Sequence, residues 1–490
     1  MTEAATRHLT AGLELLGRDE PNRAVFAFRE ANRLAPDSAD VVAALGYALG
    51  RLHAVEQAAA CYREALRLDP GHIAALTNLG EVLRSRGDLD GAERLFARAL
   101  ETEPALVEAL SNLALVRQSS GDPAGAEALL RRAIALRPGF PDAWWNLASA
   151  LMDVDRVAEA AAAAAASVEL APNRAEGHWN LGLAHSMLGG MAPSIASFRR
   201  ALALAPDSAT LHWNYALALL AAGQWSEGWE EWEWRFRAGV AQPLPSGPPE
   251  WMGGDPAGRT ILVRGEQGLG DTLMFLRYAQ ELARRGATVI VDVQPRLREL
   301  VALQPGISRS GEPTHQVSIG SLPRLLGTRV CSIPAQSPLV VPAALCDRWA
   351  AWLERFPRPR IGFCRSGNPA YKRNRLRSVP VGVEPGFPVV SLDLGGVPEA
   401  DNLLDTAALV SGLDLVVTVD TMVAHLAGAL GKPVRILLAH YADWRWLVGR
   451  GDSPWYPTAR LLRQPGPGDW GTVLGNLQER LATSVSQRRR

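Results

Sequence analysis

The sequence has very little lysine and no excess charge, and both shortages restrict the function of the chain. Only two of the 490 residues are lysine, Lys372 and Lys432. Basic and acidic residues balance at 51 each, which argues against a protein built to neutralise nucleic-acid phosphates or anionic lipid. We therefore expect no nucleic-acid partner, and we expect ligands to be recognised by shape and local chemistry.

Cysteine and long apolar runs are also scarce. The four cysteines are too few to staple a chain of this size and lack the close spacing of zinc or redox motifs. No uncharged apolar run reaches the roughly 18 residues of a membrane-spanning helix. The first residues do not form a basic region followed by an apolar core, as a secretory signal would. We therefore expect a cytoplasmic protein without membrane insertion.

A regular repeat fills the N-terminal half. Prolines recur every 34 residues, which is the tetratricopeptide period, at Pro36, Pro70, Pro104, Pro138, Pro172 and Pro206. Small residues recur with the same period, at Gly12, Gly46, Gly80, Ala114, Ala148, Gly182 and Ala216. Each unit is a helical hairpin that buries its apolar face only against its neighbours. The pattern predicts an all-α solenoid of about seven repeats over residues 5–242.

One column of the repeat is polar and consists of asparagines: Asn78, Asn112, Asn146, Asn180 and Asn214. On a concave surface such a ladder of carboxamides can pair with the backbone of an extended polypeptide, whatever its sequence. The alternative is that these side chains form hydrogen bonds between neighbouring units. Both interpretations stay open, and one residue can serve both. The groove itself predicts a polypeptide partner.

The junction that follows is first aromatic and then rich in proline. Trp225, Trp229, Trp232 and Phe236 lie on one face of a helix. We favour a structural interpretation, in which this stripe packs the last repeat helix on the next domain, over a ligand-stacking platform. Residues 243–259 contain too many prolines for a helix and predict an ordered strap or linker.

From Thr260 the pattern becomes that of alternating strands and helices, which predicts a parallel α/β region in two Rossmann-like halves, 260–341 and 358–485. The predicted strands are 261–263, 287–293, 360–364, 389–392, 415–419 and 434–438, and the predicted helices are 271–285, 404–413 and 421–430. Ligands of such sheets bind at the carboxyl ends of the strands. The turns after Val263, Cys364 and Val419 are therefore expected to converge on one cleft.

The turn after Val263 contains Gly268 and Gly270, which allow a substrate to approach the backbone, and places Asp271 at a helix start. From this turn alone, a helix cap is the preferred explanation of Asp271. The turn after Val419 combines Thr421 at a helix N-terminus with His425 one turn later. The free amides and the Thr421 hydroxyl predict an anion-binding site, whereas a lone histidine is more often structural, so both interpretations of His425 stay open.

The turn after Cys364 is cationic and holds one of the two lysines, Lys372, together with Arg377 and the nearby Asn368. Clustered cations are what a diphosphate requires when it leaves with growing negative charge. The alternative is a solvated basic loop. Because the sequence uses arginine almost everywhere else, the lysine at this position favours a role for a compact ammonium group.

Four segments together resemble bacterial tetratricopeptide proteins with a heptosyltransferase-like glycosyltransferase domain. They are EQGLGD at 266–271, SGNPAYKRNRLRSVP at 366–380, DTMVAHLAGALGKP at 420–433 and DWRWLVGRGDSPWYP at 443–457. The architecture is also similar to that of O-linked N-acetylglucosamine transferases. The resemblance implies a GT-B fold, with inversion at the sugar and no metal or other cofactor. It also implies that Asp271 is the general base, that Lys372 neutralises the diphosphate, and that Asp420, Thr421 and His425 line the site of a UDP- or ADP-linked sugar.

One segment departs from the family pattern. Residues 379–388, VPVGVEPGFP, cannot form the crossover helix that normally joins two parallel strands. We therefore carry two hypotheses. The first is a protein-directed glycosyltransferase in which Asp271 removes the proton of a hydroxyl acceptor. The second is a non-catalytic adaptor whose solenoid binds a partner and whose α/β region is degenerate.

Overall fold

The structure is a computed structural model that describes residues 1–266, 268–369, 374–393, 396–397 and 402–488. It contains two compact units, Met1–Ala184 and His185–Arg490, and each unit is described by itself. The helices α12, α13 and α14 of the repeat array belong to the second unit, so the limits proposed above for the domains remain a prediction. Among the described residues, no helix is both long enough and apolar enough to cross a membrane.

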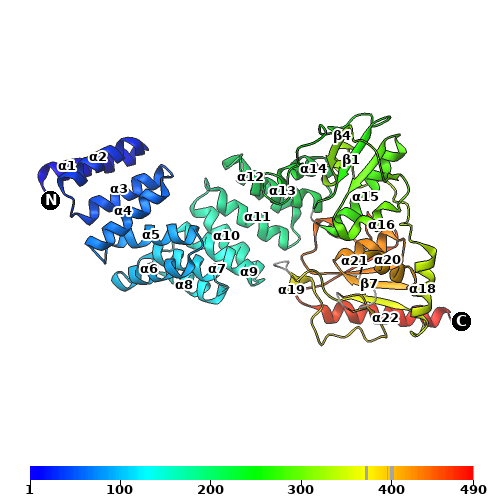
Figure 1. The fold of residues 1–490 in the computed structure, drawn as a ribbon. Helices are drawn as coiled ribbons and strands as arrows, with labels where there is room; N and C mark the ends of the chain where they lie inside the picture. Colours follow the sequence, from blue (N-terminus) through cyan, green and yellow to red (C-terminus); the bar gives the residue numbers. More distant parts are fainter. Residues whose placement is uncertain (267, 370–373, 394–395, 398–401, 489–490) are drawn as a thin grey trace. The chain divides into compact units, whose positions relative to one another are not determined.

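The N-terminal region is an array of antiparallel helix pairs, as the 34-residue period predicts (Figure 1). Its helices are α1 (Glu3–Gly17), α2 (Pro21–Leu34), α3 (Ala39–Arg51), α4 (Val55–Leu68), α5 (Ile73–Ser85), α6 (Leu89–Thr102), α7 (Val107–Ser119), α8 (Pro123–Leu136), α9 (Pro141–Asp153), α10 (Val157–Leu170), α11 (Ala175–Met187), α12 (Met191–Leu204), α13 (Ala209–Ala221) and α14 (Trp225–Trp232). The second helix of several pairs begins at or just after a proline or an aspartate cap.

The small residues of the repeat allow the helices of one pair to touch. A Cβ atom added to Gly80 would lie 2.8 Å from the ring of Phe96, and one added to Gly46 would lie 2.8 Å from the ring of Tyr62. Both rings are buried. The column of small residues and the column of aromatic residues therefore form one packing device, which is repeated along the array.

Within the compact unit Met1–Ala184, polar contacts join successive repeats. Arg98 and Arg132, which are 34 residues apart, donate hydrogen bonds of 2.7 Å to the carbonyl oxygens of Pro70 and Pro104. The carbonyl of a helix-ending proline thus accepts from the next repeat. Ion pairs such as Arg86–Glu56, at 2.5 Å, add exposed contacts of small individual energy.

The second unit begins with the last repeat helices and confirms the structural interpretation of the tryptophan stripe. Trp225, Trp229 and Trp232 of α14 are 2%, 1% and 4% exposed. Trp225 stacks on Trp455, and Trp229 contacts both Phe275 and Trp444 edge to face. These partners come from both halves of the α/β region, so α14 is part of its core.

The proline-rich segment after α14 is an ordered strap, as predicted. Trp251 is buried, and its amide donates to the carbonyl of Gln316 at 2.8 Å. The side chain of Gln316 donates in turn to the carbonyl of Pro245. The strap therefore lies along the edge strand β4 (His315–Ser318).

The α/β region contains two parallel sheets, and this confirms the predicted fold class. The first sheet has the order β3-β2-β1-β4 and the second the order β6-β5-β7-β8-β9. The elements are η1 (Glu233–Arg235), β1 (Thr260–Arg264), α15 (Leu269–Arg284), β2 (Thr288–Asp292), η2 (Pro295–Leu297), α16 (Arg298–Ala302), β3 (Ile307–Ser308), β4, η3 (Ile319–Ser321), α17 (Leu322–Leu325), α18 (Ala343–Leu353), β5 (Ile361–Cys364), α19 (Asn374–Arg377), β6 (Val390–Ser391), α20 (Leu403–Ser411), β7 (Leu415–Val419), α21 (Met422–Ala429), β8 (Val434–Leu438), η4 (Trp444–Trp446), β9 (Ala459–Arg463) and α22 (Trp470–Arg488).

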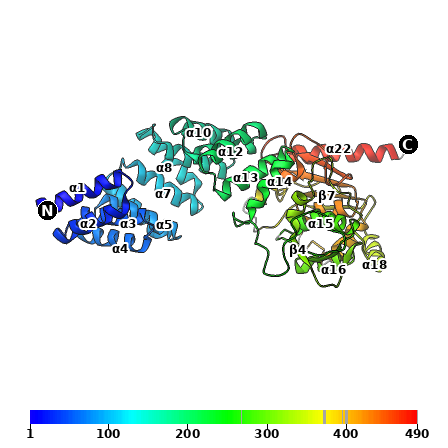
Figure 2. The same cartoon turned by 90° about the horizontal axis from the view of Figure 1, so that it is seen from above.

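The second sheet is covered on both faces, which is why its central strand reads as a continuous apolar run. Leu415, Val417 and Val419 of β7 pack with Trp470 and Leu474 of α22. Val416, between them, belongs to the core formed with α20 and α21. Both views show β7 between α22 and α15 (Figures 1 and 2).

The connection from β5 to β6 lacks a long crossover helix in its described residues, as the sequence predicts. Its one helix there is α19, which has four residues. Val379 and Val383 pack instead beneath α22. In its described residues, this connection contains only a short helix and covers the sheet with valines.

Candidate active site at the carboxyl ends of the strands

The candidate site lies at the carboxyl ends of the strands, at the point in each sheet where the strand order reverses. In the first sheet β1 is flanked by β2 and β4, and in the second β5 is flanked by β6 and β7. At such switch points the turns after neighbouring strands leave in opposite directions and create a crevice. The turns that the sequence singles out follow β1, β5 and β7.

The N-terminus of α15 presents the carboxylate of Asp271. Gly268 is the N-cap residue of this helix, and a Cβ atom there would lie 2.6 Å from Oδ2 of Asp271. The absence of a side chain at Gly268 therefore makes room for the carboxylate. Asp271 lies in the first turn of α15, and no hydrogen bond from a helix amide to its carboxylate is present in the described residues. The capping and the catalytic interpretation of Asp271 both remain predictions.

Asp271 forms an ion pair with Arg445 of η4, which joins the two halves of the α/β region. The Asp271 side chain is 33% exposed and that of Arg445 is 13% exposed. Withdrawal from solvent raises the pKa of Asp271, and the Arg445 guanidinium opposes this shift. Asp271 is therefore a carboxylate whose basicity depends on one neighbouring cation.

Sequence reasoning missed Arg445 as a functional residue, although the segment that contains it was recognised. Its Nη1 lies 2.5 Å from Oδ1 of Asp443, and its guanidinium lies 4.7 Å from the ring centre of Trp444. Desolvation lowers the pKa of Arg445, but the carboxylates of Asp271, Asp443 and Asp420 raise it more, so the net shift is upward. The contact between Arg445 and Asp271 joins segments that are far apart in the sequence, so no periodic pattern in the sequence predicts it.

His425 is a buried packing residue in this structure. It is 4% exposed, its Nδ1 lies 3.0 Å from the hydroxyl of Tyr456, and its ring stacks on Trp446. Burial and the nearby Arg445 and Arg277 lower the pKa of His425 well below its usual value, so the imidazole is neutral at physiological pH. A Cβ atom at Gly270 would lie 2.7 Å from Cδ2 of His425, so this glycine allows α15 to contact α21.

Thr421 caps α21. Its hydroxyl accepts from the amide of Val423 at 3.2 Å and lies 3.2 Å from the hydroxyl of Thr418. The helix has eight residues and carries no acidic side chain in its first turn. The positive end of the helix dipole therefore faces the turn after β7, and no carboxylate in the first turn of α21 neutralises it.

Asp420 is half-buried between β7 and α21. Burial and the neighbouring Asp443 carboxylate raise the pKa of Asp420 to about 6, against the opposing charges of Arg445 and Arg377. This side chain can therefore hold a proton under mildly acidic conditions.

The cationic turn approaches the same place. A Cβ atom at Gly367 would lie 3.0 Å from Nη2 of Arg377 and 3.3 Å from Cγ2 of Thr421. The guanidinium of Arg377 is thus close to the N-terminus of α21. Asn368 is exposed, and Lys372 lies outside the described residues.

The asparagine column is paired within the protein at several positions. Asn146 and Asn180 are buried and donate to Ser111 and to the carbonyl of Trp145, which belong to the preceding unit. Asn78 and Asn214 donate to carbonyls four residues earlier in their own helices, and Asn112 is half-buried. Hydrogen bonding between neighbouring repeats is therefore the role of Asn146 and Asn180, and pairing of the column with a peptide remains a prediction.

The described residues hold no group of three or more histidine, cysteine, aspartate or glutamate side chains placed to bind a metal ion.

Comparison with known proteins identifies the N-terminal array. Three tetratricopeptide-repeat family models match the chain, over residues 39–72, 72–138 and 118–181. The N-terminal array therefore contains tetratricopeptide repeats, and a parallel α/β region follows it. None of the three matched ranges extends into the α/β region.

A curated relative extends the similarity. Protein FlbA of Caulobacter vibrioides (strain ATCC 19089 / CIP 103742 / CB 15) is 26% identical over 323 residues, which cover 54% of this chain and 53% of FlbA. The chain therefore spans about half the length of the curated relative that it matches.

Solved structures resemble part of the chain. They include pilF of Pseudomonas aeruginosa, which is 21% identical with a TM-score of 0.38 and covers 44% of this chain and 95% of that chain. They also include the APC/C hetero-tetramer Cut9-Hcn1, which is 19% identical with a TM-score of 0.42 and covers 44% of this chain and 43% of that chain. Similarity at this level carries no information on function.

Proposed function

We propose that this tetratricopeptide-repeat protein is a glycosyltransferase that moves a sugar from a nucleotide-diphosphate donor to a hydroxyl group. The observation that carries the proposal is the meeting of Asp271, from the first half of the α/β region, with Arg445 from the second half. An acid–base group and a set of cations at the switch points of two parallel sheets suit a reaction between two bound substrates.

Asp271 is the general base in this proposal. A carboxylate whose pKa is raised by burial is a better proton acceptor than a solvated one. The ion pair with Arg445 keeps it ionised, and the proton of the acceptor hydroxyl is transferred to Asp271 as the oxygen attacks the anomeric carbon. Gly268 leaves the space in which this carboxylate lies.

The departing nucleotide diphosphate is stabilised at α21. Arg377 lies near the N-terminus of that helix, and the helix dipole adds positive potential where the leaving group gains negative charge. Lys372 supplies a further ammonium group in this proposal, and Asn368 and Thr421 supply hydrogen-bonding groups. His425, neutral and buried, together with Gly270 and Asp420 shapes the floor of the donor site.

The acceptor is a polypeptide held by the repeats. Tetratricopeptide arrays present grooves that bind extended chains, and exposed amide groups of the asparagine column can pair with a peptide backbone. Asn78 and Asn214 donate within their own helices and Asn112 is half-buried, so these three are the first choice for such contacts. Asn146 and Asn180 must first exchange their partners in the preceding repeat.

A substitution at Asp271 tests the base. In the proposal, Asp271→Asn lowers the turnover number for release of UDP or ADP from the corresponding sugar donor by at least about a hundredfold, because general-base catalysis typically contributes that much. The matched control is Asp347→Asn, the same change at an exposed position of α18. Transfer at the wild-type rate by Asp271→Asn contradicts the base assignment.

Binding of the donor is tested separately from chemistry. UDP, ADP and their sugars are added to the full chain, and thermal unfolding is measured with and without Lys372→Ala. A nucleotide at about a hundred times its dissociation constant stabilises the folded state by roughly 2.7 kcal/mol. Stabilisation by one nucleotide that weakens in Lys372→Ala supports the donor site.

The second candidate is a non-catalytic adaptor. The irregular β5–β6 connection, whose described part contains only the four-residue helix α19, favours it. In that case the chain binds a polypeptide through its repeats, and no nucleotide in the panel changes the unfolding temperature.

A further inference from the structure

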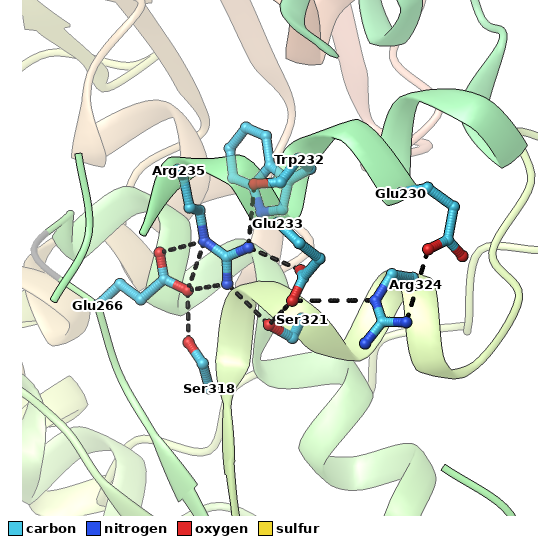
Figure 3. Close-up of polar contacts among 8 residues, drawn as sticks. All are labelled: Glu230, Trp232, Glu233, Arg235, Glu266, Ser318, Ser321 and Arg324. Atoms are coloured by element: carbon cyan, nitrogen blue, oxygen red, sulfur yellow. Dashed lines mark hydrogen bonds and ion pairs between the residues drawn. The ribbon is translucent and has the colours of Figure 1, made fainter. Parts of the chain in front are cut away.

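A second buried arginine, outside the candidate site, connects the last repeat to the turn that precedes Asp271. Arg235 lies in η1, directly after α14, and is 1% exposed. Its Nη2 donates to Oε1 of Glu266 at 2.8 Å, and its Nε is 3.1 Å from the other carboxylate oxygen (Figure 3). Glu266 lies two residues after β1, in the turn that leads to α15.

Every nitrogen of this guanidinium has a partner. Nη1 donates to Glu233 at 2.7 Å and to the carbonyl of Trp232 at 3.2 Å, and Nη2 also donates to the hydroxyl of Ser321 at 2.8 Å. Figure 3 shows these contacts converging on Arg235 from different segments. A charge this deeply buried is tolerated only when it is fully paired, so the network has one well-defined geometry.

Glu266 is held on its other side as well. Its Oε1 accepts from the hydroxyl of Ser318 at 2.5 Å, and a Cβ atom at Gly320 would lie 2.3 Å from the same oxygen. The carboxylate therefore occupies a pocket shaped by β4 and η3. Any displacement of Glu266 breaks bonds to Arg235 and Ser318 together.

The backbone of Glu266 continues the connection toward α15. Its carbonyl accepts from the side chain of Gln294, and Oε1 of Gln294 accepts from the hydroxyl of Thr272 at 3.1 Å. Thr272 is the residue after Asp271. A continuous series of hydrogen bonds thus runs from the last repeat to the first turn of the helix that carries the proposed base.

We infer that Arg235 is a positioning residue, which fixes the turn before α15 through Glu266 and so sets the place of Asp271. The significance of that place for catalysis rests on the proposed function, whereas the fixing of the turn does not. Arg235 contacts no reacting group, and it acts only through Glu266 and Gln294.

The experiment compares single and double substitutions in the full chain. Arg235→Met leaves the half-buried Glu266 carboxylate, 18% exposed, without its cation, and this lowers the unfolding temperature. Arg235→Met with Glu266→Met removes both charges, and such replacements by apolar groups of similar volume are often neutral for stability. Glu233, which also loses Arg235 as a partner, still has a cation nearby, because Nε of Arg324 lies 3.9 Å from its Oε2. Arg237→Met is the matched control, since Arg237 lies two residues after Arg235, is exposed and stacks on Trp234.

Amide hydrogen exchange is measured on a peptide that covers residues 262–274. We expect exchange there to become at least about tenfold faster in both Arg235→Met and the double variant, even though the double variant regains the unfolding temperature. The control changes neither quantity. If turn protection returns together with the unfolding temperature in the double variant, or is never lost, Arg235 is only a stabilising residue and the inference is wrong.

Transfer kinetics separate this inference from the proposed function. If the wild-type protein transfers sugar, the double variant should show a turnover number at least about tenfold lower with a nearly unchanged KM for the donor, because a misplaced base affects the transition state rather than ground-state binding. An unchanged turnover number overturns the positioning role. If the wild-type protein transfers nothing from UDP- or ADP-sugars, the proposed function fails, and the exchange result alone decides whether Arg235 fixes the turn.

Discussion

The two compact units differ in where they place paired arginine side chains. In the first unit, arginines lie at the surface and pair with carboxylates of adjacent repeats, as in Arg86–Glu56, where the side chains are 33% and 81% exposed. The second unit also has exposed arginines, but two of its arginines are fully inside: Arg235 is 1% exposed and Arg277 is 2% exposed. The difference shows that the repeats are held by many weak, equivalent contacts, whereas the α/β region depends on a few buried polar networks.

This contrast follows from how each region closes its core. A repeat contacts only its neighbours, so each pairing recurs with the period of the sequence. The α/β region brings segments together that are far apart in sequence, such as Arg277 and Trp455. Polar groups that are buried in such contacts must be satisfied, so each of them is costly to disturb.

The largest stability effect is expected at Arg277. Its nitrogens donate to the carbonyl oxygens of Trp455 and Met274 and to Oε1 of Gln336, at 2.7 to 2.9 Å. Arg277→Met removes the donor to all three acceptors, including the carbonyl of the buried Trp455, and we expect a loss of about 3 kcal/mol in the free energy of unfolding. Urea unfolding followed by tryptophan fluorescence measures it, since all but Trp144, Trp145 and Trp179 of the 15 tryptophans lie in the second unit.

The matched control for that substitution is Arg86→Met in the repeat array. Because its ion pair is exposed, we expect a loss below about 1 kcal/mol, measured by far-UV circular dichroism. Equal losses at Arg277 and Arg86 would show that the contrast between the two units has no energetic meaning.

A smaller effect is expected where α15 meets α21. Gly270→Ala places a methyl group 2.7 Å from Cδ2 of His425, so one of the two helices must move. We expect a loss of about 1 to 3 kcal/mol in the free energy of unfolding, as for other overpacked cores. Gly17→Ala, at a position with open space around it, is the control and should be neutral or slightly stabilising. A neutral Gly270→Ala would mean that the contact relaxes freely.

The smallest effect concerns Asp420 and depends on pH. Burial and Asp443 raise the pKa of Asp420 to about 6, above its value in the unfolded chain, so ionised Asp420 opposes folding. This cost is absent below about pH 4, grows as the pH rises toward 6, and is complete above it. Asp420→Asn should therefore raise the free energy of unfolding by up to about 2 kcal/mol near neutral pH and leave it unchanged near pH 4.

Unfolding curves of the wild-type protein and Asp420→Asn at both pH values measure this difference. A stability gain that is the same at both values would assign the effect to packing of the amide rather than to ionisation of the carboxylate.

Local patterns in the sequence predicted most of the fold. The spacing of Pro36 to Pro206 defined the helix pairs, the strand at 434–438 was predicted with its observed bounds, and the residues 379–388 were correctly predicted not to form a helix. The stripe of Trp225, Trp229 and Trp232 was also interpreted correctly as a packing face. These features depend on neighbours in the sequence or on a repeated period, so they can be seen without the structure.

The site was predicted only in part. Asp271, Arg377, Asp420, Thr421 and His425 lie near the carboxyl ends of β1, β5 and β7, as the topology of parallel sheets requires. The sequence did not indicate that Arg445 pairs with Asp271, that His425 is buried and neutral, or that Asn146 and Asn180 bond to the preceding repeat. Each of these depends on the distance between side chains of separate segments.

The sequence by itself therefore determined the period of the repeats, the change to a parallel α/β pattern and the positions of the polar turns, because helix and strand periodicity and the steric limits of proline and glycine act locally. Only the tertiary structure decided which charges are paired and which are buried. Desolvation and hydrogen bonding depend on everything that surrounds a group, and for Arg235, Arg277 and Arg445 those surroundings come from segments that the sequence keeps far apart.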